Sequence, residues 1–320
     1  NYIMQFFQHT NIDFLSKRKM FYLASTALIV IGMVAFFAKG LVIGIDFAGG
    51  TEVLVRFQND VEINSIRSAM DVSGISGAEI KTLGNERDIL IRSAEPGEGT
   101  TVSDRIKDGL VKNIPGNKFE ILRIDKVGPK IGKELSTSAI YATIFSLIAI
   151  LIYLAFRFEF LYALGSVVAL LHDVLMTLGI VAITGALFPS FNLELNQGMV
   201  AAFLTLIGFS VNDTVVVFDR IRENIKLFKS ESIFSVMNKS LNYTLNRTII
   251  TNGTVFITVL ILLIFGGEVN RSFAFTFLIG IITGTYSSIY VAGAFVVDAK
   301  GFLDKKRSPG STRKVAVNKA

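Results

Sequence analysis

The sequence contains no cysteine, so neither a disulfide framework nor a thiolate metal site can form. Histidine is scarce too, with two residues in a chain of 320. The sequence also shows no cluster of metal ligands, no nucleophile beside a base, and no glycine-rich phosphate loop followed by Lys-Ser or Lys-Thr. These absences argue against an enzyme and against a bound cofactor.

Charge is missing from long parts of the chain. A membrane-spanning helix needs about 20 mostly apolar residues. Six stretches fit this requirement, the third and fourth with a few polar residues and the others without any charge: 21–38, 136–156, 161–187, 199–218, 248–267 and 272–297. Because 320 residues supply too little polar chain to bury six such helices in a soluble core, we predict a polytopic α-helical membrane protein with six transmembrane helices.

Basic residues gather at alternate ends of the six stretches, so the net charge of +6 indicates membrane topology rather than binding to nucleic acid. The connection 219–247 has six basic and three acidic residues, whereas 188–198 has no basic residue. The positive-inside rule then places both termini in the cytoplasm. We expect a cytoplasmic N-terminal segment (1–20), a retained first transmembrane helix (21–40) rather than a signal peptide, and a basic, flexible cytoplasmic tail (298–320) near anionic membrane lipid.

Residues 44–133, between the first two helices, have ordinary soluble composition and would lie on the periplasmic side. Their order of elements is β-α-β-β-α-β, which is typical of a small ferredoxin-like α+β domain. Alternation and helical spacing give these elements in turn at 51–57, 61–72, 78–83, 88–92, 102–114 and 118–127. The domain has no His and no Cys, so we expect it to serve contact and leverage rather than chemistry.

Residues 134–297 hold the second to sixth transmembrane helices. Within them, 220–246 mixes charged and apolar residues, which predicts an amphipathic cytoplasmic segment lying in the membrane interface. The sixth helix carries small residues that suit close helix packing, namely Gly280, Gly284, Ser287 and Ser288.

An ionisable residue inside a membrane span is a candidate functional residue, because placing it there costs roughly 2.5–3.5 kcal/mol. Two carboxylates lie within the predicted spans, and Asp213, beside the polar Asn212, is the stronger functional candidate. It could be a proton carrier or a paired structural acid. Arg247 is its nearest basic partner, although it is equally well placed as a positive-inside anchor. His172 and Asp173 lie near the middle of the third span, as a proton relay or as a hydrogen-bonded packing feature.

Two further motifs indicate no particular chemistry when they are taken as sequence patterns alone. Gly44, Asp46, Gly49 and Gly50 belong to a glycine-rich turn, GIDFAGG, between the first helix and the small domain. Asp219 and Arg220 belong to a charged helix end in GFSVNDTVVVFDRIREN.

Together with VGPKIG (127–132), FRFE (156–159), LLHD (170–173) and LNRTIITNGT (245–254), these motifs resemble the SecF members of the SecD/SecF family of bacterial protein-export membrane proteins. The resemblance covers nearly the whole chain.

The resemblance implies a place in the resistance-nodulation-division (RND) superfamily, with this chain as one half of a twelve-helix transporter and SecD as the other. It also implies a bacterial inner-membrane location and three sets of partners: SecD, the SecYEG translocon with YajC, and the unfolded polypeptide in transit. The pair would use the proton-motive force to draw that polypeptide out at the periplasmic side. The family's proton-conducting acid and its basic partner match Asp213 and Arg247.

Two other functions stay open from the residues alone. A proton-driven RND exporter of small molecules would need large periplasmic domains, and the single small domain here argues against it. A passive scaffold subunit of the translocon would not need Asp213 or Arg247.

Overall fold

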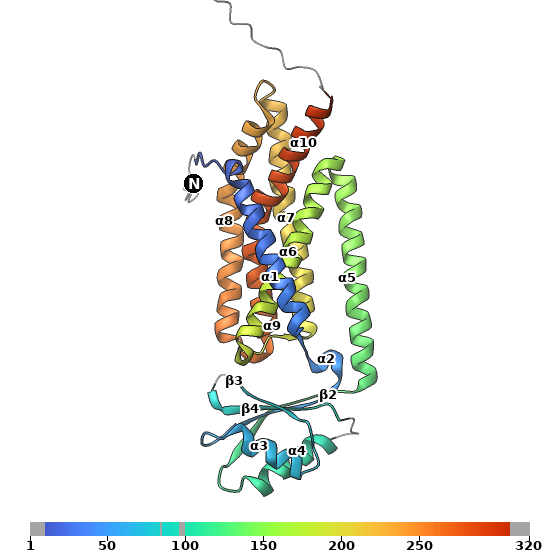
Figure 1. Cartoon of the computed structure of the whole chain (residues 1–320), viewed down its shortest axis with the longest axis vertical. Helices are drawn as coiled ribbons and strands as arrows, with labels where there is room; N and C mark the ends of the chain where they lie inside the picture. The colour runs from blue at the N-terminus through green and yellow to red at the C-terminus, as the bar shows by residue number, and fades with distance from the viewer. Residues whose placement is uncertain (1–9, 84, 96–99, 308–320) are drawn as a thin grey trace, which may run out of the picture.

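The computed structural model describes residues 10–83, 85–95 and 100–307. Long helices stand side by side in one bundle, and a small α+β domain lies beyond one end of it (Figure 1). Both ends of the described chain lie at the opposite end of the bundle from the small domain (Figure 1). This arrangement agrees with the predicted topology, in which the termini and the small domain are on different sides.

Within the described residues, six helices are long and apolar enough to cross a membrane, as predicted. The last of them is continuous but becomes π-helical part-way along, over Ser288–Gly293. The bundle consists of η1 (Leu15–Lys17) leading into α1 (Arg18–Lys39), α5 (Pro129–Arg157), α6 (Phe160–Leu187), α7 (Gln197–Leu227), α8 (Ile233–Phe265), and α9 (Gly267–Ser287) continuing through η3 (Ser288–Gly293) into α10 (Ala294–Arg307).

The small domain confirms the predicted β-α-β-β-α-β order. Its four strands form an antiparallel sheet in the order β3-β4-β2-β5, and the two helices cover the sheet face that points away from the bundle (Figure 1). Alternate apolar strand residues, such as Val53 and Ile91, are buried against those helices. The elements are β2 (Gly50–Phe57), α3 (Ile63–Val72), β3 (Glu79–Leu83), β4 (Asn85–Ser93), α4 (Thr101–Asn113) and β5 (Phe119–Val127).

The opposite face of the sheet is charged and is tied to the bundle through Arg92. The residue is 8% exposed, and its guanidinium pairs with Glu52 on the neighbouring strand, with Glu79, and with Glu194 in the connection between α6 and α7. Burial by itself would lower the pKa of Arg92, but the carboxylates of Glu194 and Glu52 hold it above its ordinary value. Glu194 belongs to β6 (Glu194–Leu195), which pairs in parallel with β1 (Val42–Ile43), directly after α1.

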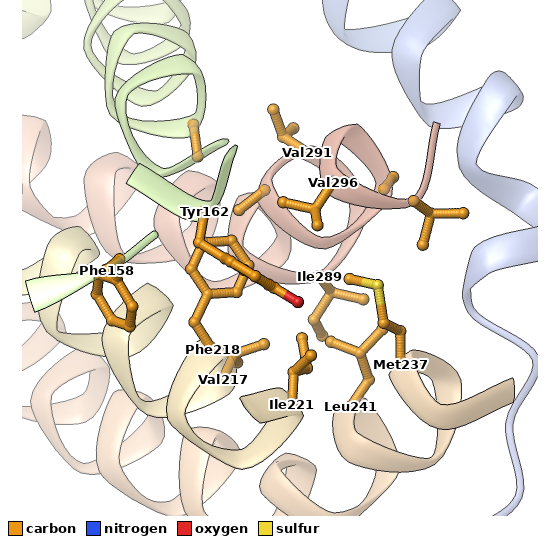
Figure 2. Close-up of a cluster of buried hydrophobic side chains, with 14 of the residues drawn as sticks. Phe158, Tyr162, Val217, Phe218, Ile221, Met237, Leu241, Ile289, Val291 and Val296 are labelled. Carbon is orange, nitrogen blue, oxygen red and sulfur yellow. The ribbon is translucent and has the colours of Figure 1, made fainter. Parts of the chain in front are cut away.

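An apolar core closes the end of the bundle where the chain termini lie. Figure 2 shows Phe218 and Ile221 of α7 facing Tyr162 of α6 and Leu241 of α8. The ring of Phe218 meets that of Tyr162 edge to face, with 5.1 Å between centroids.

This core also shows what the apolar residues of segment 220–246, which we expected to lie in the membrane interface, contact within the chain. Helix α7 continues to Leu227 and α8 already begins at Ile233, so the apolar residues of the segment face one another and the core. Asn224 also donates to Ser240 across the two helices, at 2.8 Å. The amphipathic pattern was present in the sequence, but a stripe that faces lipid head groups has the same spacing as one that faces another helix.

The ends of the chain are more ordered than expected where they are described. Helix α10 extends to Arg307, so the first part of the tail 298–320 is helical, and 308–320 lie outside the described residues. In the N-terminal segment 1–20, Ile12 is held by the side chains of Asn238 and Asn242 on α8.

Arg92→Met should loosen the small domain from the bundle. The change removes the cation between Glu52 and Glu194, but Arg123 still pairs with Glu52 and Lys81 with Glu194. The cost should therefore stay below the roughly 3–5 kcal/mol of a buried charge that is left unpaired. Hydrogen exchange of the full chain in nanodiscs would report this as faster exchange in β4 and in the connection 188–196.

Arg56→Met is the matched control, because Arg56 pairs with Asp88 at the surface and should cost only about 0–1 kcal/mol. Equal effects of the two substitutions would contradict the role given to Arg92.

A buried polar cluster between the long helices

Asp213 lies inside the bundle, on α7, with its side chain 7% exposed. Its two carboxylate oxygens accept hydrogen bonds from neutral hydroxyls on two other elements. Thr248 of α8 donates to Oδ1 at 2.9 Å, and Ser288, the first residue of η3, donates to Oδ2 at 2.8 Å. The acid therefore sits where three helical elements meet, held by groups that carry no charge.

Arg247 and Asn212 do not join this group. Both side chains are exposed on the surface of the isolated chain, on α8 and α7. Among the ion pairs of the described residues, none joins Arg247 to Asp213 within 4.0 Å. Arg247 is nevertheless the neighbour in sequence of Thr248, which contacts the acid directly.

His172 and Asp173 form a second buried group on α6. Asp173 is 0% exposed, and its Oδ1 lies 2.9 Å from Nδ1 of His172. Its Oδ2 accepts from Ser210 of α7 at 2.5 Å and from Ser287 of α9 at 2.7 Å. The pair expected from the sequence is thus a hydrogen-bonded centre between three helices.

From His172 the hydrogen bonds continue to the first helix of the bundle. The Tyr286 hydroxyl lies 2.8 Å from Nε2 of His172 and 2.9 Å from the hydroxyl of Ser25 on α1. With Asp173 ionised, the imidazole donates from Nδ1 to that carboxylate, and Nε2 accepts from Tyr286. Sequence reasoning missed Ser25, Ser210 and Tyr286, because single hydroxyls in apolar helices are common and give no pattern.

Glycines bring the helices close enough for these contacts. A Cβ on Gly280 would meet Leu206 of α7 at 2.8 Å, and one on Gly32 of α1 would meet the Cα of Gly179 of α6 at 2.3 Å. Gly284, like Gly280, thus has the packing role predicted for it, against Ser210. Ser287 and Ser288 were expected only to pack, but they donate to the two carboxylates.

The GIDFAGG turn joins the small domain to the start of α7, the helix that carries Asp213. Asp46, in α2 (Ile45–Ala48), accepts from the backbone N–H of Gln197 at 2.9 Å, and the N–H of Gly44 donates to Leu195 at 3.0 Å. Gly49 and Gly50 have φ of 74° and 131°, and a Cβ on Gly50 would come 2.5 Å from the Ser93 carbonyl oxygen. The motif is therefore a joint that only glycine can make.

Asp219 and Arg220 lie apart from the polar cluster, near the terminal end of the bundle. Asp219 pairs with Arg157 at the end of α5. Arg220 pairs with Glu223 and lies over the ring of Tyr243. These contacts join the end of α5 to α7, and α7 to α8.

The cluster gathers ionisable side chains and hydroxyls inside the bundle. Among the described residues, no group of three His, Cys, Asp or Glu side chains is placed to hold a metal ion. Two buried carboxylates, one imidazole and several hydroxyls remain, at the depth of the apolar helices. Ionisable residues at such depth mark proton relays and ion pathways in membrane proteins.

Comparison with known proteins gives the family. The model of the family described as "Protein export membrane protein SecD/SecF, C-terminal" matches residues 106–301, and that of the "SecD/SecF GG Motif" matches 34–61. The chain belongs to the SecD/SecF family.

Curated relatives in the family match this chain over nearly its whole length. The protein translocase subunit SecF of Calditerrivibrio nitroreducens is 45% identical over 90% of this chain and 93% of its own length. That of Rhodothermus marinus is 42% identical over 97% of this chain and 100% of its own. The chain is thus a SecF homologue and a multi-pass membrane protein.

Solved structures agree. The crystal structure of SecDF, a translocon-associated membrane protein from Thermus thermophilus, superposes with a TM-score of 0.79 at 34% identity. The match covers 91% of this chain and 39% of the SecDF chain. A structure of SecDF in a super-membrane-facing form gives a TM-score of 0.69 at 33% identity, covering 95% and 40%. This chain therefore spans about two fifths of the length of SecDF.

Asp46→Ala should loosen the first turn of α7. The substitution removes the side-chain acceptor of the Gln197 N–H, and losing such an acceptor at a helix start costs about 0.5–2 kcal/mol. Hydrogen exchange at the first residues of α7 should become faster. Asp60→Ala is the control, because Asp60 forms an exposed pair with Arg87. If hydrogen exchange in α7 were unchanged in both variants, Asp46 would not hold the start of this helix.

Proposed function

We propose that this chain is the SecF subunit of a proton-driven accessory complex of the Sec translocase, with Asp213 as the proton carrier. The observation that carries the proposal is the burial of Asp213 among neutral hydroxyl donors, in a chain of this family. A carboxylate at that depth without a fixed cation can take up and release a proton, and the hydrogen bonds around it then change.

Its principal partner would be SecD, as the other half of a twelve-helix transporter. Two features of the surface support this. Arg247 and Asn212 expose polar side chains at membrane depth, where contact with lipid is costly. Helix α5 stands apart from the other helices (Figure 1), with apolar residues such as Phe145 and Ile152 exposed.

The complex would act in the bacterial inner membrane on SecYEG, together with YajC. Both termini of this chain would be cytoplasmic, and its small domain periplasmic. There the pair would help to draw unfolded polypeptide out of the channel. A small-molecule exporter is less well supported, because the one small domain uses its helix-covered face for its own core.

Arg247 would control Asp213. Its charge is permanent, and it lies on α8 beside Thr248, the hydroxyl that already holds the acid. A modest rearrangement of α8 against α7 would bring the guanidinium to the carboxylate and favour release of the proton.

Movement at Asp213 has a direct path to the small domain. Asp213 lies on α7, whose first residue is held by Asp46, and the connection before α7 carries Glu194 to Arg92. A proton crossing a potential of 100 mV releases about 2.3 kcal/mol. Several protons per cycle would therefore suffice to shift a domain held by a few such contacts.

Asp213→Asn should reduce protein export to the level of a strain depleted of this subunit. Asparagine keeps the size of Asp213 but cannot ionise. Its amide oxygen can accept from one of the two hydroxyls, and its NH2 group can donate to the oxygen of the other. The chain would be expressed with its SecD in the depleted strain at matched membrane levels, and maturation and release of a secreted protein would be followed.

Asp298→Asn is the control for the export measurement, since Asp298 forms an exposed pair with Arg18. Undiminished export in Asp213→Asn would identify Asp213 as a packing residue and favour a passive scaffold subunit.

Arg247→Gln should also abolish stimulated export, whereas Arg247→Lys should retain part of it, because a cation remains near Thr248. The same assay tests both. Equal activity of the Gln and Lys variants would show that the charge of Arg247 is not used.

A further inference from the structure

Two neighbouring serines each donate to a different buried carboxylate. Ser287 donates to Oδ2 of Asp173 on α6, and Ser288 donates to Oδ2 of Asp213 on α7. We propose that Ser287 and Ser288 are positioning residues that couple two proton-binding sites, Asp173 and Asp213. The role of Asp213 in this coupling rests on the proposed function above.

Each serine hydroxyl has a second acceptor within reach. Ser287 Oγ lies 2.7 Å from the carboxylate of Asp173 and 3.2 Å from the backbone carbonyl of Gly284. Ser288 Oγ lies 2.8 Å from the carboxylate of Asp213 and 3.2 Å from the carbonyl of Thr285. A hydroxyl has a single hydrogen, so it can donate fully to only one of the two.

Protonation decides between these acceptors. An ionised carboxylate is the stronger acceptor and takes the serine hydrogen. When the carboxylate binds a proton, its own O–H can donate to the serine oxygen, and the serine hydrogen turns to the carbonyl of its own helix. The only covalent bond formed is the O–H bond between the carboxylate and the incoming proton, and the serine O–H bond stays intact.

The serines stand where the helix changes its hydrogen-bonding pattern. Helix α9 ends at Ser287, and the π-helical turn η3 begins at Ser288. π-helical turns inside α-helices are found mostly as single turns at functional sites. Because the two residues are adjacent, a rearrangement of this turn caused by one carboxylate moves the hydroxyl that serves the other.

Few other titratable groups face Asp173. His172 and Tyr286 contact it directly or through one hydrogen bond. On the elements packed against α6, several charged groups form contacts toward the helix ends: Arg18 with Asp298, Arg157 with Asp219, Lys39 with the Ala186 carbonyl, and Lys300 with Tyr162. Asp213 is therefore the acid to which Asp173 is connected most directly.

Infrared difference spectra between acidic and alkaline buffer would test the coupling. The sample is the chain co-purified with its SecD in lipid nanodiscs, and the signal is the C=O stretch of protonated carboxyl groups. We expect Asp213→Asn to remove one component of this band and Asp173→Asn another. Asp173→Asn should also shift the titration midpoint of the Asp213 component by about one pH unit, as for strongly coupled acids.

The serines are tested by repeating the measurement in Ser287→Ala/Ser288→Ala. There the shift caused by Asp173→Asn should vanish, as in a double-mutant cycle that removes the connection. Ser166→Ala is the control: its hydroxyl is equally buried on α6 but donates only to the Tyr162 carbonyl, so the shift should persist. If Asp173→Asn fails to assemble with SecD, the reciprocal shift of the Asp173 component in Asp213→Asn gives the same coupling.

Two results would overturn the proposal: no carboxyl component lost in Asp173→Asn, or a shift that persists unchanged without the serines. A different outcome separates the two proposals. If Asp213→Asn left export undiminished while the unmutated chain showed both carboxyl components and their coupling, the proposed function would be overturned and the coupling would stand.

Discussion

The structure depends on keeping two carboxylates inside a bundle of apolar helices. Asp173 and Asp213 are both buried, and neither has a lysine or arginine in contact with it. Their oxygens are satisfied by hydroxyls from α7, α8, α9 and η3 and, at Oδ1 of Asp173, by the imidazole of His172. Such contacts require the helices to approach closely, which explains the glycines at the crossings of α1 with α6 and of α9 with α7.

The same helices connect the carboxylates to the small domain. Helix α7 carries Asp213 in its middle and begins at the joint formed by Asp46 and the GIDFAGG turn. Beside this joint, Arg92 gathers carboxylates from the sheet and from the connection before α7. The domain therefore rests on the start of the helix whose centre holds the acid.

Some contacts were predictable and others were not, for reasons visible in particular residues. Asp213, His172 and Asp173 stand out in the sequence because a charge in an apolar run is rare and costly. Ser287 and Ser288 do not stand out, since serine is common in such helices and its role depends on what lies opposite. Arg247 looked like the contact of Asp213, yet Thr248 makes that contact, because a difference of one residue turns a helical side chain by about 100°.

The sequence by itself determined the six long helices, their relative orientation, the ferredoxin-like order of the small domain and the positions of the buried acids. These features follow from local composition and periodicity, which each segment carries without its neighbours. Only the tertiary structure decided which faces meet: that apolar residues of 220–246 pack into the core, that Arg92 joins the small domain to Glu194, and that adjacent serines serve two different carboxylates. Such pairings depend on the rotation and spacing of whole helices, and no single segment encodes them.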